Sequence, residues 1–395
     1  MHNLAAAAAL LPAGLMDVLP PFAAFEACTV ERLIAHFAGY GYERVKPPLI
    51  EFAETLLAGS GAALAPETFQ LMDPISRRML ALRPDMTMQV ARIASSRLAH
   101  WPRPLRLGYA GQVLRVRGSQ LRPERQFGQV GAEIVGADSA KADVEVVVMA
   151  TSALTELGIT ELTVDLGAPN LVPAILGASR IADEEVLSRL RVALDRKDVA
   201  AIDALTPALG RSTTELLSRL VTITGPTEAA LAALAALDLP ALAAAERARL
   251  IDVHAGLRAG AAKLTLTIDA VESRGFEYHT GVTYAIFATA AVDEIGRGGR
   301  YRTEAGEAAT GVTLFMDAVL RALPRPEQPC HRLLLPPDTP VQVALALRRE
   351  GWVTVMSFDR DCDVMAEAAR LGCSHVFADG EPRAADAAGI ARAED

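Results

Sequence analysis

The sequence has no run of apolar residues approaching the roughly 20 that a transmembrane helix needs, although 51% of its 395 residues are hydrophobic and only 22% are charged. The Ala-rich start, residues 3–11, is a weak match to a secretion signal because no Lys or Arg precedes it. We therefore expect an N-terminal helix or frayed tail there, and a soluble, cytoplasmic protein with no membrane partner. A chain of this length has room for two or three domains.

Cysteine and concentrated positive charge are also scarce. The chain has four cysteines, Cys28, Cys330, Cys362 and Cys373, and their spacing matches no zinc or redox motif. Reduced thiols in the cytosol and no bound metal are the prediction. A net charge of -9 argues against a nucleic-acid binder, although a local basic patch could still exist.

Phosphate-loop signals are missing as well. The two Gly-rich segments, residues 272–281 and 296–301, lack the strand, turn and helix context of a phosphate loop. We find no candidate nucleophile or metal cluster either, and so predict neither a catalytic residue nor a cofactor.

The stretch at residues 105–136 is the most informative part of the chain. It reads as a strand at 106–116, a break at 117–123 and a second strand at 125–135. Side chains two residues apart share one face of a strand, and on the second strand that face carries Phe127, Gln129, Gly131, Glu133 and Val135. Two polar side chains around a Gly suit the floor of a site for a small charged ligand. A solvated outer face of the sheet is the alternative.

Upstream of this hairpin, residues 43–52 are predicted to form one strand, with Pro47-Pro48 at an edge or an interface. A short hairpin over 71–82 leads to a helix at 88–98, for which Asp85 or Thr87 is the predicted N-cap. Capping alone would explain both residues. The remaining predicted elements before residue 170 are helices at 22–40 and 140–157 and a strand at 161–166.

Downstream, residues 171–263 show helical spacing of Ala, Leu, Asp and Arg and no strand signal, which predicts an all-helical insertion. Strands at 264–269 and 282–288 follow, and then a helix at 313–323. From residue 331 to 395 strands and helices alternate, which indicates a small α/β unit.

Seven short motifs resemble histidyl-tRNA synthetase in order and spacing. This resemblance implies that residues 1–323 have an α+β fold like that of the class II aminoacyl-tRNA synthetases. In this fold helices flank an antiparallel sheet, and residues 171–263 would be a helical insertion within it. Residues 331–395 are similar to a shortened anticodon-binding domain. The motifs are Pro12-x-Gly14-x-x-Asp17-x-x-Pro20, Gly41-Tyr42-x-x-Val45-x-x-Pro48, Leu82-Arg83-Pro84-Asp85-x-Thr87, Arg115, Arg125-Gln126-Phe127-x-Gln129-x-Gly131-x-Glu133, Arg274-Gly275-x-x-Tyr278 and Gly298-Gly299-Arg300-Tyr301.

Two departures from the synthetase pattern affect ATP binding. Arg117 stands where the family has a Glu that accepts from the adenine amino group, and Arg has no acceptor. Ala318 stands where the family has an Arg that holds the ATP phosphates. Each lost charge-assisted contact weakens binding by about 1.5 to 3 kcal/mol, so adenylation should be severely impaired. From His331 onward, 7 Lys/Arg face 11 Asp/Glu, and a tail of net charge -4 is poorly suited to tRNA.

The amino-acid side of the resembled pocket is retained. By the resemblance, Asp85, Thr87 and Gln129 face the α-ammonium of histidine, Arg115 and Arg274 face its carboxylate, and Glu133 faces the imidazole. Tyr278 is present, but His279 replaces the family's second Tyr. An Arg115–Glu133 salt bridge is the alternative use of these charges.

A pocket that keeps amino-acid binding and loses ATP chemistry resembles the regulatory subunit of ATP phosphoribosyltransferase, a synthetase paralogue. The resemblance implies a non-catalytic subunit that pairs with a short-form catalytic subunit in the first step of histidine biosynthesis and binds free histidine for feedback inhibition. It also implies a homodimer formed through residues 41–52 and no tRNA partner. The alternatives are a working histidyl-tRNA synthetase and an amino-acid-binding paralogue in another pathway, which His279 keeps open.

Overall fold

The chain divides into two compact units, Met1–Pro324 and Arg325–Asp395. The computed structural model describes residues 10–118, 122–179, 183–272, 278–324, 331–360 and 363–385. Among these residues, no helix is both long enough and apolar enough to cross a membrane. Arg274, Cys330, Cys362 and the start of the Ala-rich segment lie outside the described residues.

A nine-stranded sheet forms the centre of the larger unit, in the order β1-β5-β6-β12-β11-β10-β7-β9-β8. Its neighbours are antiparallel, as predicted, except for the parallel pairs β1–β5 and β7–β9. The strands are β1 (Glu43–Arg44), β5 (Leu105–Leu114), β6 (Gln126–Val135), β7 (Leu162–Gly167), β8 (Thr224–Pro226), β9 (Thr265–Asp269), β10 (His279–Ala288), β11 (Gly296–Arg302) and β12 (Ala308–Phe315). The predicted hairpin at 105–136 is the β5–β6 pair, so this prediction is confirmed.

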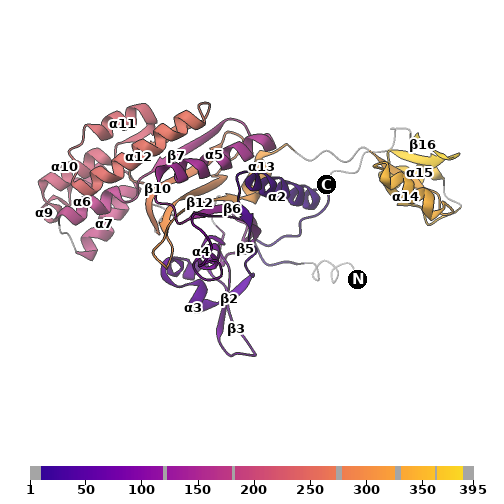
Figure 1. The fold of residues 1–395 in the computed structure, drawn as a ribbon, viewed down its shortest axis with the longest axis horizontal. Helices are drawn as coiled ribbons and strands as arrows, with labels where there is room; N and C mark the ends of the chain where they lie inside the picture. The colour runs from indigo at the N-terminus through magenta and orange to yellow at the C-terminus, as the bar shows by residue number, and fades with distance from the viewer. Residues whose placement is uncertain are drawn as a thin grey trace. The chain divides into compact units, whose positions relative to one another are not determined.

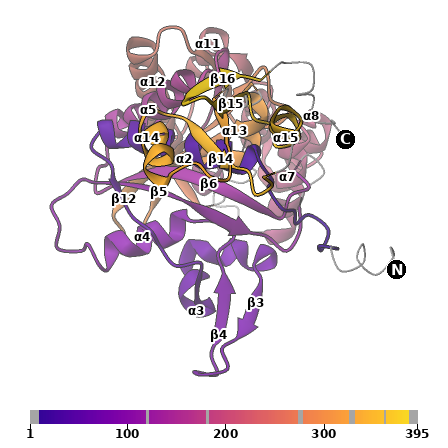
Figure 2. The same ribbon diagram turned by 90° about the vertical axis from the view of Figure 1, so that its right-hand side faces the viewer.

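Helices cover both faces of this sheet. Helices α2 (Phe22–Gly39) and α5 (Ala140–Leu157) pack on one face, and α4 (Thr87–Ser95) lies on the other, as Figures 1 and 2 show. The bounds of α5 match the prediction because both ends carry local signals. The Ser139 side chain accepts a hydrogen bond from the Lys141 N–H, and Gly158 takes a left-handed φ of 106°.

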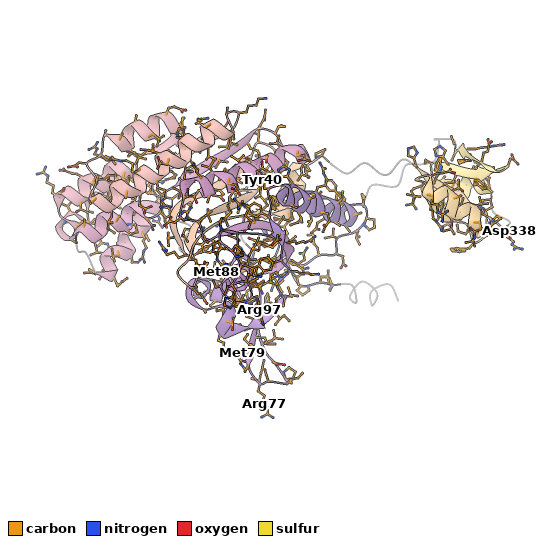
Figure 3. All side chains as sticks on the ribbon, viewed as in Figure 1. Tyr40, Arg77, Met79, Met88, Arg97 and Asp338 are labelled. Atoms are coloured by element: carbon orange, nitrogen blue, oxygen red, sulfur yellow. The ribbon has the colours of Figure 1, made fainter. Side chains whose placement is uncertain are left out.

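The predicted strand at 43–52 is wrong as one element. It is divided into β1 in the large sheet and β2 (Ile50–Phe52) in a separate sheet of order β2-β4-β3, with β3 at Gln70–Met72 and β4 at Met79–Leu82. Pro47 and Pro48 between the two pieces have no N–H to donate to a ladder, and their carbonyls accept from Arg83 Nη1 instead. The predicted 71–82 hairpin is the β3–β4 pair, with Arg77 at its tip (Figure 3).

In its described residues, 171–179 and 183–263, the insertion contains helices and one short strand. Its helices are α6 (Leu171–Ser179), α7 (Glu184–Asp195), α8 (Val199–Asp203), α9 (Thr206–Leu209), α10 (Arg211–Leu220), α11 (Thr227–Ala235) and α12 (Ala241–Gly260). The strand β8 corrects the all-helical prediction. It has only three residues, two of them Gly225 and Pro226, and pairs along the sheet edge with β9, so its composition carries almost no strand signal.

The last part of the larger unit shows a shifted boundary. The helix predicted at 313–323 begins at residue 316, as α13 (Met316–Ala322), because Thr313 to Phe315 continue β12. In this register Thr313 lies opposite Gly131 of β6 and Gly311 lies opposite Glu133. The boundary therefore places Thr313 beside the polar residues of β6.

The small C-terminal unit is α/β, as predicted. Its sheet has the order β14-β13-β15-β16, with α14 (Val341–Arg349) and α15 (Val364–Arg370). Strands β13 (Arg332–Leu335), β14 (Val353–Met356) and β15 (His375–Ala378) are parallel, and β16 (Glu381–Ala384), which the sequence analysis missed, runs antiparallel to β15.

Candidate ligand site

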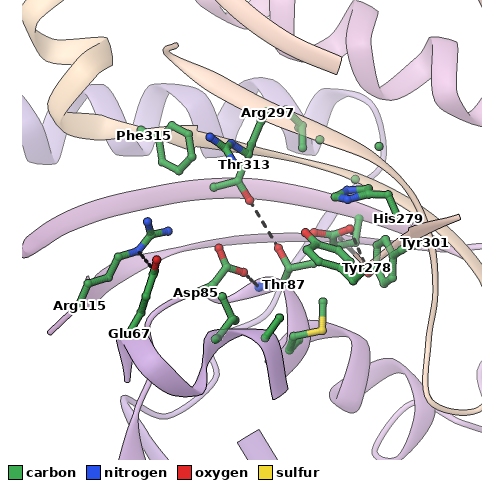
Figure 4. Close-up of a pocket in the computed structure, with 18 of the residues that line it drawn as sticks. Glu67, Asp85, Thr87, Arg115, Tyr278, His279, Arg297, Tyr301, Thr313 and Phe315 are labelled. Carbon is green, nitrogen blue, oxygen red and sulfur yellow. Dashed lines mark hydrogen bonds and ion pairs between the residues drawn. The ribbon is translucent and has the colours of Figure 1, made fainter. Parts of the chain in front are cut away.

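A cavity of about 400 Å³ opens between α4, the centre of the large sheet and the start of β10. Six of the eight predicted site residues line it: Asp85, Thr87, Arg115, Glu133, Tyr278 and His279. Figure 4 shows most of these side chains pointing toward one space. Gln129 does not line the cavity, and Arg274 lies outside the described residues.

Glu133 lies at the bottom of this cavity and is 1% exposed. The Tyr109 hydroxyl donates to its Oε1 and the Tyr301 hydroxyl donates to its Oε2, each at 3.1 Å. Burial opposes the ionised form and outweighs these two hydrogen bonds, so the pKa of Glu133 rises to about 8. The carboxyl group is therefore mainly protonated in the empty pocket at neutral pH, and no described Arg or Lys forms an ion pair with it. The alternative interpretation of this strand, a solvated outer face of the sheet, is wrong, because every residue of β6 after Gln126 is buried.

The space above Gly131 is filled by protein and not left for a ligand. A Cβ atom at Gly131 would clash with the end of the Tyr109 ring, which lies across the β5–β6 ladder opposite this glycine. The Tyr109 hydroxyl also lies 3.1 Å from Thr87 Oγ1 and 2.9 Å from Thr313 Oγ1. Gly131 thus admits the tyrosine, and the tyrosine joins Glu133 to the two threonines in one hydrogen-bond network.

Asp85 is held in place by its neighbours. Its Oδ1 accepts from the Thr87 N–H at 2.8 Å, and its Oδ2 accepts from Gln129 Nε2 at 2.9 Å. Gln129 is fully buried, and its Oε1 accepts from the Met86 N–H. The expectation that Gln129 faces the ligand is therefore corrected, since both ends of its amide are used to position Asp85 and the start of α4. The N-cap of α4 is Met86 and neither Asp85 nor Thr87, so that prediction is wrong by one residue; Asp85 still accepts from the Thr87 N–H in the first turn.

Of the two arginines predicted to bind the ligand carboxylate, Arg115 belongs to the part of the chain that the structure describes. Its guanidinium lies 3.5 Å from Glu67 Oε2 and over the Phe127 ring, and its Nε donates to the Pro84 carbonyl at 3.4 Å. The alternative Arg115–Glu133 salt bridge is not formed. Because Glu67 is nearly half exposed and the contact is long, this ion pair is weak enough for a ligand carboxylate to replace.

The other end of the cavity is aromatic. The rings of Tyr278 and His279 lie 4.1 Å apart at 30°, and Tyr278 meets Tyr301 edge-on at 6.0 Å. His279 is 7% exposed and packs against Gly299, where a Cβ would lie 2.8 Å from the His279 ring. A flat ring entering beside Glu133 would meet this aromatic wall.

The side of the cavity where a synthetase would hold ATP is changed as the sequence predicts. Arg117 is exposed, and Ala318 is buried on α13 with 2% exposure. Arg122 crosses this region over the Phe315 ring at 4.1 Å and pairs with Asp293 and Asp317 at 3.4 and 3.3 Å. On the side of the cavity where a synthetase would hold the ATP phosphates, Asp293 and Asp317 therefore neutralise the charge of Arg122.

Sequence reasoning missed several lining residues, among them Glu67, Arg122, Arg297, Tyr301 and Thr313. Tyr301 lies inside one of the seven motifs, so alternation along β11 could have indicated it. Thr313 was expected at the start of a helix and lies instead on β12. Glu67 and Arg297 carry no such signal, because their positions depend on the path of the loops. Within the described residues, no group of three His, Cys, Asp or Glu side chains could hold a metal ion.

Known proteins with a similar sequence or structure show the structural class of this chain. The sequence profile of the histidyl-tRNA synthetase family matches residues 14–319. A solved structure from Bacillus halodurans C, described as an ATP phosphoribosyltransferase regulatory subunit/histidyl-tRNA synthetase, is similar with a TM-score of 0.80 at 25% identity, covering 91% of this chain and 96% of its own. The larger unit therefore has the class II, histidyl-tRNA synthetase-like fold that the resemblance predicted.

A closer relationship follows from a curated protein of Paramagnetospirillum magneticum, an ATP phosphoribosyltransferase regulatory subunit. It is 54% identical over 93% of this chain and 95% of its own length. The chain belongs to the family of ATP phosphoribosyltransferase regulatory subunits, which confirms the prediction of a regulatory subunit and not a catalyst. The ATP phosphoribosyl transferase (HisG:HisZ) complex from Thermotoga maritima is similar in fold, with a TM-score of 0.57 at 19% identity over 74% of this chain and 97% of that one.

Proposed function

We propose that this chain activates a short-form ATP phosphoribosyltransferase catalytic subunit in the first step of histidine biosynthesis and binds free histidine for feedback inhibition. The observation that carries the proposal is the cavity itself. It combines an anion, a cation and a buried carboxyl with an aromatic wall, while two groups that would hold ATP are replaced.

The chemistry of the cavity matches the parts of histidine. The Asp85 carboxylate, held by Gln129 and the Thr87 N–H, would accept from the α-ammonium. Arg115, paired only loosely with Glu67, would bind the carboxylate, with Arg274 as the second cation by resemblance. Glu133 would bind the imidazole, which would lie against Tyr278 and His279.

The Glu133 pKa adds a reason to favour an imidazole. A carboxyl with a pKa of about 8 keeps its proton at neutral pH and can donate a hydrogen bond to the unprotonated nitrogen of an imidazole, whose own pKa is about 6.5 in water. A ligand with an apolar side chain would offer no acceptor there.

The assembly also forms part of the proposal. The Thermotoga neighbour is a HisG:HisZ complex, and we propose the same kind of hetero-oligomer for this chain, with a homodimer of the regulatory subunit inside it and a cytoplasmic location. No tRNA partner is proposed, since the C-terminal tail is acidic and Arg117 and Ala318 replace nucleotide contacts.

The test is calorimetric titration of histidine into the purified chain and its variants. Glu133→Ala and Arg115→Ala should each weaken histidine binding by about 1.5 to 3 kcal/mol, or one to two decades in Kd. Activation of the catalytic subunit should survive both changes. Matched controls are Glu215→Ala and Arg97→Ala, which alter exposed side chains outside the cavity. Unchanged affinity and unchanged inhibition in both pocket variants would place the regulatory site elsewhere.

A further inference from the structure

A second cavity lies beside α4 and shares Met88 and Tyr301 with the lining of the histidine pocket. It has a volume of about 320 Å³ and is enclosed by α3 (Ala53–Leu56), α4 and the turn after β11. This volume is within the range of small-molecule sites, about 300 to 1,000 Å³. We call it the α3–α4 cavity; Figure 2 labels the two helices, α3 and α4, that contribute to its lining.

Two buried polar atoms on α4 have no hydrogen-bond partner among the described residues: Gln89 Oε1 and Ser95 Oγ. Both residues line the α3–α4 cavity. Gln89 is 1% exposed. Its Nε2 donates to the Pro48 carbonyl at 2.8 Å and to Glu51 Oε1 at 2.9 Å. Because both of those partners are acceptors, the amide orientation is fixed and the oxygen is the atom left over. A buried polar atom of this kind indicates a missing ligand or water.

The cavity is close to neutral. Glu51, its acidic lining residue on β2, is bound by Arg92 through two hydrogen bonds and also by Gln89. Arg302 and Glu304 at the rim have opposite charges. The charges of these two Arg and two Glu side chains sum to zero, so the lining as a whole would not neutralise a buried charged ligand.

The cavity also has an apolar, partly aromatic surface. Met88, Leu56 and Ala91 line it, and so does Tyr301, which is 2% exposed. Met88 and Tyr301 line the histidine pocket as well. An aromatic ring and a thioether are favourable contacts for a flat heterocycle.

We propose that the α3–α4 cavity binds a neutral, flat heterocycle of nucleobase size, which donates a hydrogen bond to Gln89 Oε1 and accepts one from the Ser95 hydroxyl. The Tyr301 hydroxyl holds Glu133 at 3.1 Å, so a ligand against this ring changes the position or freedom of a group in the histidine pocket. The two sites are therefore coupled, and this coupling rests on the proposed histidine site.

The probe is 9-methyladenine, a neutral base whose amino group is its one donor, titrated into the full-length chain without histidine and followed by saturation-transfer NMR and calorimetry. We expect saturable binding in the micromolar to millimolar range. N6,N6,9-trimethyladenine, which has no donor, should bind about 10-fold more weakly, because Gln89 Oε1 would stay unsatisfied.

Two variants locate the site. Ser95→Ala should weaken 9-methyladenine binding roughly 2- to 10-fold, and Ala58→Phe should abolish it by filling the cavity. Ser152→Ala on α5 is the matched control. Circular dichroism checks that each variant is folded, and Ser95→Ala keeps the test valid if Ala58→Phe is not.

The assignment would be overturned if 9-methyladenine had the same affinity for Ser95→Ala and Ala58→Phe as for the Ser152→Ala control. Equal affinities of the two bases, or no saturable binding at all, would overturn it as well. The coupling is measured separately, as the change in histidine affinity that saturating 9-methyladenine causes. This change should be smaller in the Ser95→Ala variant. If histidine does not bind at all while the base binds as expected, the proposed function fails and the α3–α4 cavity assignment stands.

Discussion

At the scale of single residues, Glu133 contributes a pH dependence to the stability of the fold. Its pKa is about 8 in the folded chain and about 4.3 in an unfolded one. Between these values the folded state holds one proton more than the unfolded state, so the stabilising contribution is complete below about pH 4 and is lost as the pH rises through 8.

The resulting prediction compares the protein with Glu133→Gln, which cannot titrate. From pH 5 to 7.5 the free energy of unfolding of the natural chain should fall relative to the variant, by up to about 1.4 kcal/mol per pH unit. Urea unfolding of both proteins at a series of pH values measures this difference. Parallel curves would show that Glu133 ionises normally in the folded state.

A second prediction at this scale concerns Gly131. A side chain there must displace the Tyr109 ring, which is fully buried. Gly131→Ala should therefore destabilise the fold by about 1 to 3 kcal/mol and weaken histidine binding. Gly177→Ala, at a helical position with open space around it, is the control, and thermal unfolding measures both. A Tm for Gly131→Ala equal to that of the control would contradict the packing.

Only part of the candidate site could be predicted from the sequence, because some of its residues lie in motifs and others depend on how strands pack. Asp85, Thr87, Arg115 and Glu133 lie within motifs, and the motifs gave their positions. The role of Gln129 could not be read from alternation, because a buried strand face supports neighbouring side chains as readily as a ligand. Likewise, the contact of Tyr109 with Gly131 depends on the register between β5 and β6, which no single strand encodes.

At the scale of elements, β2 is an edge strand. It pairs with β4 alone in the three-stranded sheet, and both its first residue, Ile50, and the preceding Leu49 are exposed. Exposed apolar edges are surfaces at which chains associate. This supports the proposed dimer through residues 41–52.

We predict that Ile50→Asp converts the dimer to a monomer at micromolar concentration, because a carboxylate would be buried without a partner in a two-fold interface. Light scattering with size-exclusion chromatography measures the mass. Val292→Asp, which alters another β-branched apolar side chain that is more exposed and lies in the turn before β11, should leave the mass unchanged. A monomer before any substitution would refute the proposed interface.

Elements with strong local signals were predictable, and those fixed by tertiary context were not. The helix α5 has a Ser cap and a closing Gly, and its bounds agree with the prediction. In contrast, the division of 43–52 between two sheets and the extension of β12 through Phe315 depend on which strands are neighbours. The short strand β8 exists because β9 offers an edge to it.

At the scale of the whole molecule, the proposed activity belongs to a complex. The purified chain alone should show neither aminoacylation nor phosphoribosyl transfer, and the catalytic subunit should become active when the two are mixed. Steady-state assays of each chain and of the mixture measure this. Robust charging of tRNA by this chain alone would refute the proposal.

Restoring the synthetase residues should not restore charging. Arg117→Glu alters an exposed position, but Ala318→Arg places a long cation where the side chain is 2% exposed, and overpacking there costs about 1 to 3 kcal/mol or more. The acidic tail is unchanged by either substitution. ATP-pyrophosphate exchange by the double variant is the assay, and exchange near a synthetase rate would be the contrary result.

The hydrogen-bond network around Tyr109 has a practical consequence. Tyr109 and Tyr301 both donate to Glu133, so any ligand that changes the charge of that carboxyl alters the electronic environment of two phenol rings. Neither of the chain's two tryptophans lines the cavity. Ultraviolet difference spectra of tyrosine should therefore record occupancy of the pocket directly, so the protein carries its own optical reporter and needs no attached dye.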